Sequence, residues 1–162
     1  MKQGKPIKIE LRRSFSASIE SVFDAWLIPY LAGSWMFGPK SLNQEIITLE
    51  NEPRSAGKFL LVVKREGQEQ KITGQYEEIR RPEKLVCSWG VDESTAKLNR
   101  LILKLESLDG KARMKLTHEL DASLVESTES ESVDALRSEW TTRCKALAEL
   151  VETSSKQARL FK

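Results

Sequence analysis

Six segments in which apolar and polar residues alternate constrain the fold of this 162-residue chain more than any other feature. They lie within residues 43–120, and a period of two is typical of β-strands with one buried face. Short turn sequences separate them, and no connection is long enough for a parallel crossover, so an antiparallel meander is predicted. The inward positions are Ile47, Leu49, Phe59, Leu61, Val63, Ile72, Tyr76, Leu85, Cys87, Trp89, Val91, Leu101, Leu103, Leu105, Met114, Leu116, His118 and Leu120.

The residues ahead of the meander predict one more strand and two short helical pieces. Residues 7–15 alternate and predict a first strand. Ser18 is placed to cap a short helix that runs from Ser21 to Leu27 and ends before Pro29. Residues 30–35 predict a second short helix or turn. Among the later turns, Asp109-Gly110 is the strongest hairpin signal.

The C-terminal part of the chain carries one long apolar stripe. Steps of three and four residues predict a helix over residues 128–151, about 24 residues or roughly 36 Å, which is long enough to cross a sheet. The tail, residues 153–162, is polar and is expected to fray. Arg137, Arg143 and Lys145, beside Glu139 and Glu149, predict a solvated helix face. The stripe consists of Val133, Leu136, Trp140, Cys144, Leu147 and Val151.

The composition argues against several classes of function. Lys and Arg number 26 against 24 Asp and Glu, and this balance predicts no nucleic-acid partner. The apolar runs are too short for membrane insertion, and residues 1–6 lack the apolar stretch of a signal peptide. One histidine and two separated cysteines predict neither a metal site nor a cofactor. Cys87 and Cys144 are expected to be reduced, buried and unreactive in a cytoplasmic protein.

A series of short motifs runs through residues 7–152 in a distinctive order. They are residues 9–15 (IELRRSF), 22–26 (VFDAW), Trp35 ahead of Gly38-Pro39, 57–59 (GKF), 74–79 (GQYEEI), 82–86 (PEKLV), 88–89 (SW), 116–118 (LTH) and 139–140 (EW). In these motifs the chain resembles the family of the activator of the heat-shock-protein-90 ATPase. That family is a branch of the helix-grip (START-like, SRPBCC) superfamily, with START lipid-transfer domains, polyketide cyclases and the birch pollen allergen.

The resemblance implies an α+β helix-grip fold, in which a curved antiparallel sheet surrounds a long C-terminal helix and two short helices follow the first strand. We expect a single domain over residues 1–162, with its core at about 6–152 and a polar tail at 153–162, as a monomer or homodimer. The chain departs from the family at Trp35-Met36-Phe37 and at Ala56-Gly57, where doubled residues are usual. No second domain like that of the eukaryotic activators is visible, which argues against a chaperone partner.

A curved sheet and one helix are expected to leave a mostly apolar cavity between them. The side chains on the inward phase of both would line it and bind a ligand. Trp35 and Phe37 precede a Gly-Pro loop signal and are candidate lid residues. The expected ligand-binding residues are Trp35, Phe37, Phe59, Leu61, Ile72, Tyr76, Cys87, Trp89, Leu103, Met114, Leu116, His118, Trp140 and Cys144.

His118 and Tyr76 are the candidate catalytic residues. A histidine at an inward position of an alternating strand is either a buried, hydrogen-bonded polar residue or a catalytic general acid or base. The sequence shows no residue that would hold the imidazole of His118 in one tautomer. Tyr76 either donates a hydrogen bond to a ligand, beside His118, or buries its ring and keeps its hydroxyl hydrated at the sheet rim.

Three functions follow from these features. The favoured one is binding of a small apolar or amphipathic ligand in the internal cavity. The second is a cyclase or hydratase that uses His118 and Tyr76, and the third is a domain that interacts with a chaperone. The lack of paired catalytic groups argues against the second, and the single domain argues against the third.

Overall fold

The computed structural model describes residues 7–28, 31–32, 35, 44–65, 67–90, 99–120 and 129–160. The order of strand, helix, six strands and long helix agrees with the prediction. The predicted second short helix or turn, residues 30–35, lies partly outside the described residues. Within it, residues 31–32 and 35 are described, and they are helical. The elements are β1 (Ile7–Phe15), α1 (Ile19–Leu27), β2 (Gln44–Asn51), β3 (Lys58–Arg65), β4 (Gln68–Arg80), β5 (Lys84–Ser88), β6 (Asn99–Leu108), β7 (Lys111–Leu120) and α4 (Glu129–Leu160).

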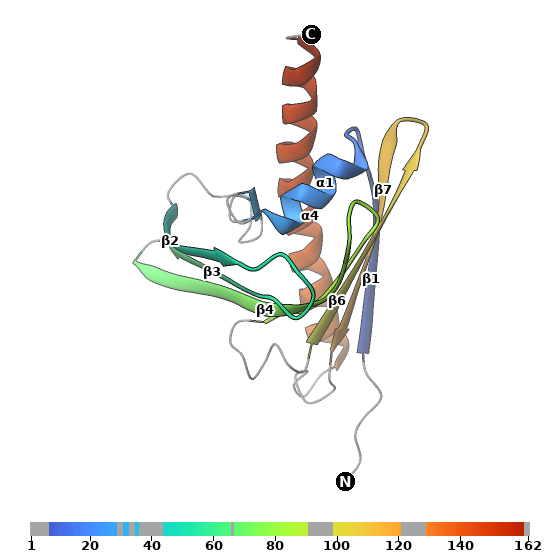
Figure 1. Ribbon diagram of the computed structural model, residues 1–162. Coiled ribbons are helices and arrows are strands. Elements are labelled where there is room, and N and C mark those ends of the chain that lie inside the picture. The colour runs from blue at the N-terminus through green and yellow to red at the C-terminus, as the bar shows by residue number, and fades with distance from the viewer. Residues whose placement is uncertain are drawn as a thin grey trace.

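The described strands form one antiparallel sheet in the order β1-β7-β6-β5-β4-β3-β2. From β2 to β7 each strand pairs with the next one along the chain, which confirms the meander, and β1 closes the far edge by pairing with β7. In Figure 1, β1, β6 and β7 stand upright while β2, β3 and β4 sweep sideways. The sheet therefore curves around α1 and α4, and the helix-grip prediction is confirmed.

The β6–β7 hairpin turns at Asp109 and Gly110, as their sequence predicts. Both residues have positive φ angles, 54° and 76°. A two-residue turn of this kind needs the left-handed region at both positions, which glycine adopts freely and aspartate tolerates. The turn fixes the register that brings Leu101 opposite His118 and Leu105 opposite Met114.

The predicted alternation of β2 is wrong at Ile47. A β-bulge between Ile46 and Thr48 shifts the register of β2 against β3. Since a bulge leaves one extra residue without a cross-strand partner, Ile47 turns outward and is 45% exposed. Val91, also predicted to face inward, lies outside the described residues.

Helix α4 is longer than the predicted helix: it continues to Leu160, so the predicted end near residue 151 was wrong. The sequence after Val151 contains neither Gly nor Pro, and it therefore offers no stop signal. The apolar stripe is buried as predicted at Trp140, Cys144, Leu147 and Val151. Leu136 is half-buried, and the side chain of Val133 is outside the described set. Near the end of the buried stretch, a carboxylate oxygen of Glu152 accepts a hydrogen bond from the backbone N–H of Ser16.

Helix α1 is held against the sheet by its cap, its apolar face and one ion pair. The Ser18 hydroxyl accepts a hydrogen bond from the backbone N–H of Ser21, so the predicted cap is confirmed, with the helix beginning at Ile19. Arg81, after β4, makes two hydrogen bonds of 2.8 Å to the carboxylate of Asp24. The buried face consists of Val22, Phe23, Ala25 and Trp26. None of the helices in the described ranges is long and apolar enough to cross a membrane.

Candidate ligand pocket

The residues predicted to face the cavity are all buried where the structure describes them. A single cross-strand row on the inner face joins Tyr76, Cys87, Leu101, His118 and Ile9, one from each of five neighbouring strands. Every member of the row is at most 4% exposed. The inward phase deduced from the sequence is therefore correct for β4 to β7, while Phe37 lies outside the described residues.

Side chains fill most of the space between the helices and the sheet. One cavity lined by described residues has a volume of about 20 Å³, room for about one water molecule. Phe59, Leu61, Tyr76, Cys87 and Trp89 line it, as predicted. The other described members of the predicted wall lie in the packed core and do not line it: Trp35, Ile72, Leu103, Met114, Leu116, His118, Trp140 and Cys144. The complete lining is Trp26, Leu27, Ala32, Asn51, Phe59, Leu61, Tyr76, Leu85, Cys87, Trp89 and Leu101.

Sequence reasoning missed the wall that faces the sheet. Trp26 and Leu27 come from the end of α1, and Ala32 follows shortly after it. Trp26 could have been found, because its spacing from Val22 and Phe23 places it on the apolar face of the helix. Asn51 gave no signal, since a polar residue at the end of a strand is ordinarily solvated.

Four aromatic rings join the pocket wall to the long helix. The Trp26 ring stacks on Trp140 with 5.9 Å between centroids, and the Trp89 ring lies 5.2 Å from Trp140. His118 meets both Trp89 and Trp140 edge to face, at 5.7 and 5.8 Å. Aromatic pairs at such separations add stability beyond the area they bury. The cluster therefore ties α1, β7 and α4 together beside the cavity, with Trp89 following directly after β5.

His118 is a neutral imidazole held in one tautomer. The indole N–H of Trp140 donates a 2.9 Å hydrogen bond to His118 Nδ1, so Nδ1 is unprotonated and Nε2 carries the proton. Burial, together with the positive charge of Arg143, lowers the pKa of His118 to about 4. Such a group is already deprotonated at neutral pH, and its basic nitrogen is occupied. His118 is thus poorly suited to general acid–base catalysis.

Tyr76 and His118 do not meet at one point. They belong to the same row but to strands three spacings apart, roughly 14 Å. The Tyr76 hydroxyl donates a 2.6 Å hydrogen bond to the side-chain oxygen of Asn51, and the Asn51 amide donates to the carbonyl oxygen of Leu27 at 2.6 Å. Burial raises the pKa of Tyr76. The hydroxyl is therefore not beside His118, and the ring is buried with its hydroxyl bonded to Asn51. Donation by Tyr76 to a ligand stays a prediction.

Three buried N–H donors around the cluster have no hydrogen-bond partner within the described part of the chain. They are the indole nitrogens of Trp26 and Trp89 and Nε2 of His118. By contrast, the indole of Trp35 donates to the carbonyl oxygen of Ala25 at 2.8 Å. Each unsatisfied buried donor costs about 1–3 kcal/mol. Trp26 and Trp89 both line the cavity, so an acceptor placed there would offset part of that cost.

Arg143 lies over the aromatic cluster instead of in solvent, and the prediction of a wholly solvated helix face was wrong at this residue. Its guanidinium is 4.9 Å from the ring centroid of Trp140 and 5.1 Å from that of Trp89. The side chain is 19% exposed and reaches Glu139 at 3.8 Å. Residue 143 follows Trp140 by three positions, so it borders the apolar stripe and can cover it with its stem.

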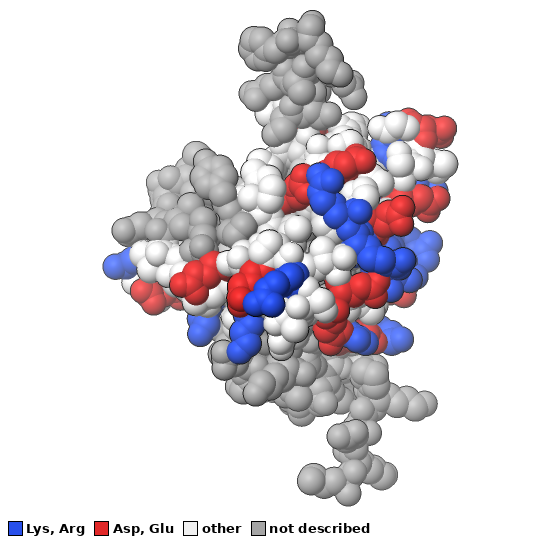
Figure 2. Space-filling model, viewed as in Figure 1, with Lys and Arg blue, Asp and Glu red and all other residues white. Residues whose placement is uncertain are grey.

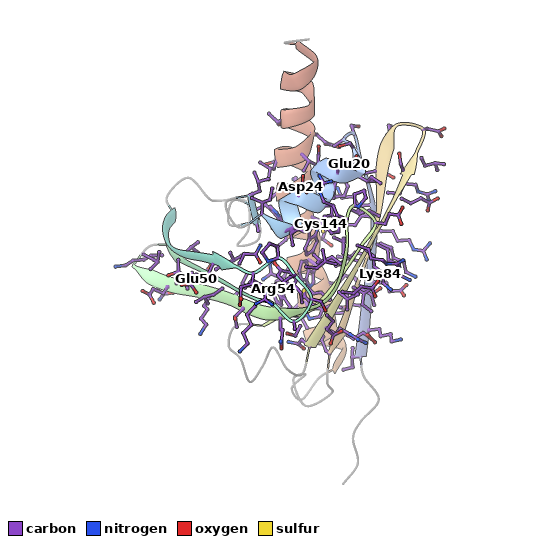
Figure 3. All side chains as sticks on the ribbon, in the orientation of Figure 1. Glu20, Asp24, Glu50, Arg54, Lys84 and Cys144 are labelled. Carbon is purple, nitrogen blue, oxygen red and sulfur yellow. The ribbon has the colours of Figure 1, made fainter. Side chains whose placement is uncertain are left out.

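Both cysteines are free and buried, as predicted. Burial raises the pKa of Cys87 to about 12 and that of Cys144 to about 11. Because the thiolate is the reactive form, we expect both thiols to react slowly at neutral pH. Figure 3 shows Cys144 on the part of α4 that faces the other elements.

Residues 16–152 match the family described as Activator of Hsp90 ATPase homolog 1-like protein. A search of curated proteins found no match. The fold is similar to that of a protein from Chromobacterium violaceum (22% identity, 90% of this chain and 96% of that chain, TM-score 0.69). It is also similar to an AHSA1-like protein from Aeromonas hydrophila (16% identity, 91% and 94% coverage, TM-score 0.72) and to Ara h 8.0201 (14% identity, 91% and 99% coverage, TM-score 0.65). These similarities establish the fold, and the family match spans most of the sequence: the chain belongs to the Activator of Hsp90 ATPase homolog 1-like family.

Proposed function

We propose that this protein binds a small, largely apolar ligand that carries a hydrogen-bond acceptor, in the pocket between α1 and the sheet. The observation that carries the proposal is the pair of unpartnered indole N–H groups, Trp26 and Trp89, on a pocket whose lining is otherwise almost entirely apolar within the described residues. Apolar walls supply affinity to a ligand, and a few polar groups fix its orientation. Because these groups only donate, the ligand they fit has a carbonyl, ether or similar acceptor.

A ligand larger than water requires the wall at α1 to move away from the sheet. The cavity of about 20 Å³ is lined on this side by Trp26, Leu27 and Ala32. Asn51 joins the end of α1 to β4, through its hydrogen bonds to the Leu27 carbonyl and the Tyr76 hydroxyl. Ligand binding should therefore break the contact between Asn51 and Leu27 first, since it spans the gap that must widen.

The two alternatives have less support. A cyclase or hydratase would need Tyr76 and His118 at one reacting bond, whereas they lie roughly 14 Å apart in the sheet. Activation of a chaperone ATPase rests on the name of the family alone. A cytoplasmic location, with two reduced buried thiols, stays the prediction for this chain.

Two ligands that differ in one group test the proposal. Cyclohexanone and methylenecyclohexane have almost the same shape, but only the ketone accepts a hydrogen bond. Isothermal titration calorimetry should show saturable binding of both, with the ketone preferred about fivefold for about 1 kcal/mol of hydrogen bonding. No saturable binding of either ligand would contradict the proposal and favour a solid core.

A matched pair of variants locates the site. Trp89→Phe keeps an aromatic ring in the pocket and removes the unpartnered N–H, so the preference for the ketone should fall while methylenecyclohexane still binds. Trp35→Phe is the control, because the Trp35 N–H is already bonded to Ala25 and the ring does not line the cavity. An equal loss of ketone preference in both variants would mean that the acceptor binds elsewhere.

A further inference from the structure

The outward face of the sheet carries a straight row of five basic residues at right angles to the strands. Arg12 pairs across the strands with Lys115, Lys115 with Lys104, Lys104 with Lys84, and Lys84 with Arg80. We call these five residues the basic row. Four strand spacings of about 4.8 Å give it a length of roughly 19 Å. Its members come from residues 12 to 115, so the row exists only once the sheet has formed.

The basic row is unfavourable for the folded sheet taken alone. Like charges that face one another directly on neighbouring strands repel. Glu78 offsets the charge at one end, with contacts of 2.7 Å to Arg80 and 3.4 Å to Lys84, and Glu10 lies 3.7 Å from Lys115. Arg12 and Lys104 have no ion-pair partner among the residues that the structure describes. The row therefore keeps uncompensated positive charge at its edge and centre.

A shallow surface groove of about 640 Å³ follows the basic row. Besides the row itself, Arg13, Arg113, Glu83 and Glu106 line it, so seven basic side chains stand against two acidic ones. Figure 2 shows Lys and Arg atoms gathered on the right-hand side of the molecule, with Asp and Glu atoms around them. In Figure 3, Lys84 lies on this same side of the sheet, away from α4.

Each strand contributes one residue to the basic row, and the cross-strand rows on both sides of it contain carboxylates. The neighbouring cross-strand row on one side begins at Glu10 and ends at Glu78, with Thr117, Ile102 and Val86 between them. On the other side, Glu106 faces Arg113. A single row of basic residues, with Glu10, Glu78 and Glu106 in the rows beside it, fits a narrow, linear polyanion better than the broad surface of an anionic membrane. Within the described residues, the groove lining contains no aromatic side chain on which a nucleic-acid base could stack.

We propose that the basic row binds an acidic helical segment of a partner protein, laid across the strands. On one face of a helix, carboxylates three and four residues apart are separated by about 5–6 Å, close to the strand spacing that separates the members of the row. About twelve residues of helix span the roughly 19 Å of the row. This surface lies on the opposite face of the sheet from the pocket, and the proposal does not depend on ligand binding.

A labelled peptide of about twelve residues, with Glu along one helical face, tests this proposal by fluorescence anisotropy. Lys104→Glu, at the centre of the basic row, should weaken binding about tenfold or more, or about 1.4 kcal/mol. Lys71→Glu is the control, because Lys71 is exposed on β4 and does not line the groove of the basic row. This substitution changes the net charge by the same amount as Lys104→Glu. The same peptide with Gln for Glu should not bind. Equal weakening by both substitutions would overturn the proposal, as would no binding of the Glu peptide.

Two further measurements distinguish an acidic protein partner from a nucleic acid, a membrane surface and a purely structural role of the basic row. The first measures binding of oligothymidylate and of phosphatidylserine vesicles to the protein. If either probe binds more tightly than the acidic peptide, and Lys104→Glu abolishes that binding, the basic row belongs to a nucleic-acid or membrane site instead. Lys104→Gln should unfold at a denaturant concentration equal to or above that of the unmodified protein, because it removes repulsion between neighbouring strands. Marked destabilisation by Lys104→Gln would show that the lysine serves the fold, and would count against a docking role.

Discussion

Acid should destabilise this protein through a single buried histidine. His118 is 1% exposed, and its pKa falls from an ordinary value of 6.5 to about 4 in the folded state. The unfolded chain therefore takes up a proton at a higher pH than the folded chain does. The stabilising contribution is complete above about pH 6.5 and is lost as the pH falls from there towards 4. Between pH 7 and 4.5 the expected loss is about 2–3 kcal/mol of unfolding free energy.

The assay is urea denaturation at both pH values, on the unmodified protein and on His118→Asn. The chain has one histidine, so the difference between the two proteins isolates this group from the carboxylates. The asparagine oxygen can still accept the hydrogen bond that Trp140 donates to Nδ1, while nothing at position 118 titrates. We expect a steep loss of stability in acid for the unmodified protein and a shallower one for the variant. Equal losses in the two proteins would refute the lowered pKa of His118.

Two other predictions concern the helix and the thiols. Trp140→Ala should lower the free energy of unfolding by about 3–5 kcal/mol, because it empties a fully buried site and leaves His118 Nδ1 without its donor. Trp140→Phe should lower it less. A denaturation midpoint unchanged by the alanine substitution would mean that α4 docks elsewhere. Cys87 and Cys144 should react with Ellman's reagent only in denaturant, since burial raises both thiol pKa values; rapid reaction of the native protein would contradict the inward phase of both residues.

The fold could be predicted because its signals are local. The period of two in residues 85–120 assigns the inner face of β5 to β7 correctly, and Asp109-Gly110 fixes the register of the last hairpin. The helix cap at Ser18 and the buried apolar stripe around Trp140 were likewise predicted from local sequence patterns. The end of α4 could not be predicted, because polarity alone does not stop a helix that lacks Gly and Pro.

The site was harder to predict because it depends on contacts between distant segments. Nothing in the sequence pairs Trp140 with His118, although their hydrogen bond decides the tautomer of the imidazole. Arg143 looked like a solvated charge, and only the placement of Trp89 beneath it explains its burial. How far side chains fill the cavity depends on packing volumes, which a pattern of apolar positions does not contain.

Ligand binding in the pocket is tested most directly by the four indole N–H resonances of the protein. The structure divides them into two classes: Trp35 and Trp140 donate to Ala25 and His118, whereas Trp26 and Trp89 have no partner among the described residues. A titration of ¹⁵N-labelled protein with cyclohexanone, followed by NMR, should move the N–H signals of Trp26 or Trp89 downfield as they gain an acceptor, with smaller shifts for Trp35 and Trp140. Saturating ketone that leaves Trp26 and Trp89 unmoved would contradict binding in this pocket.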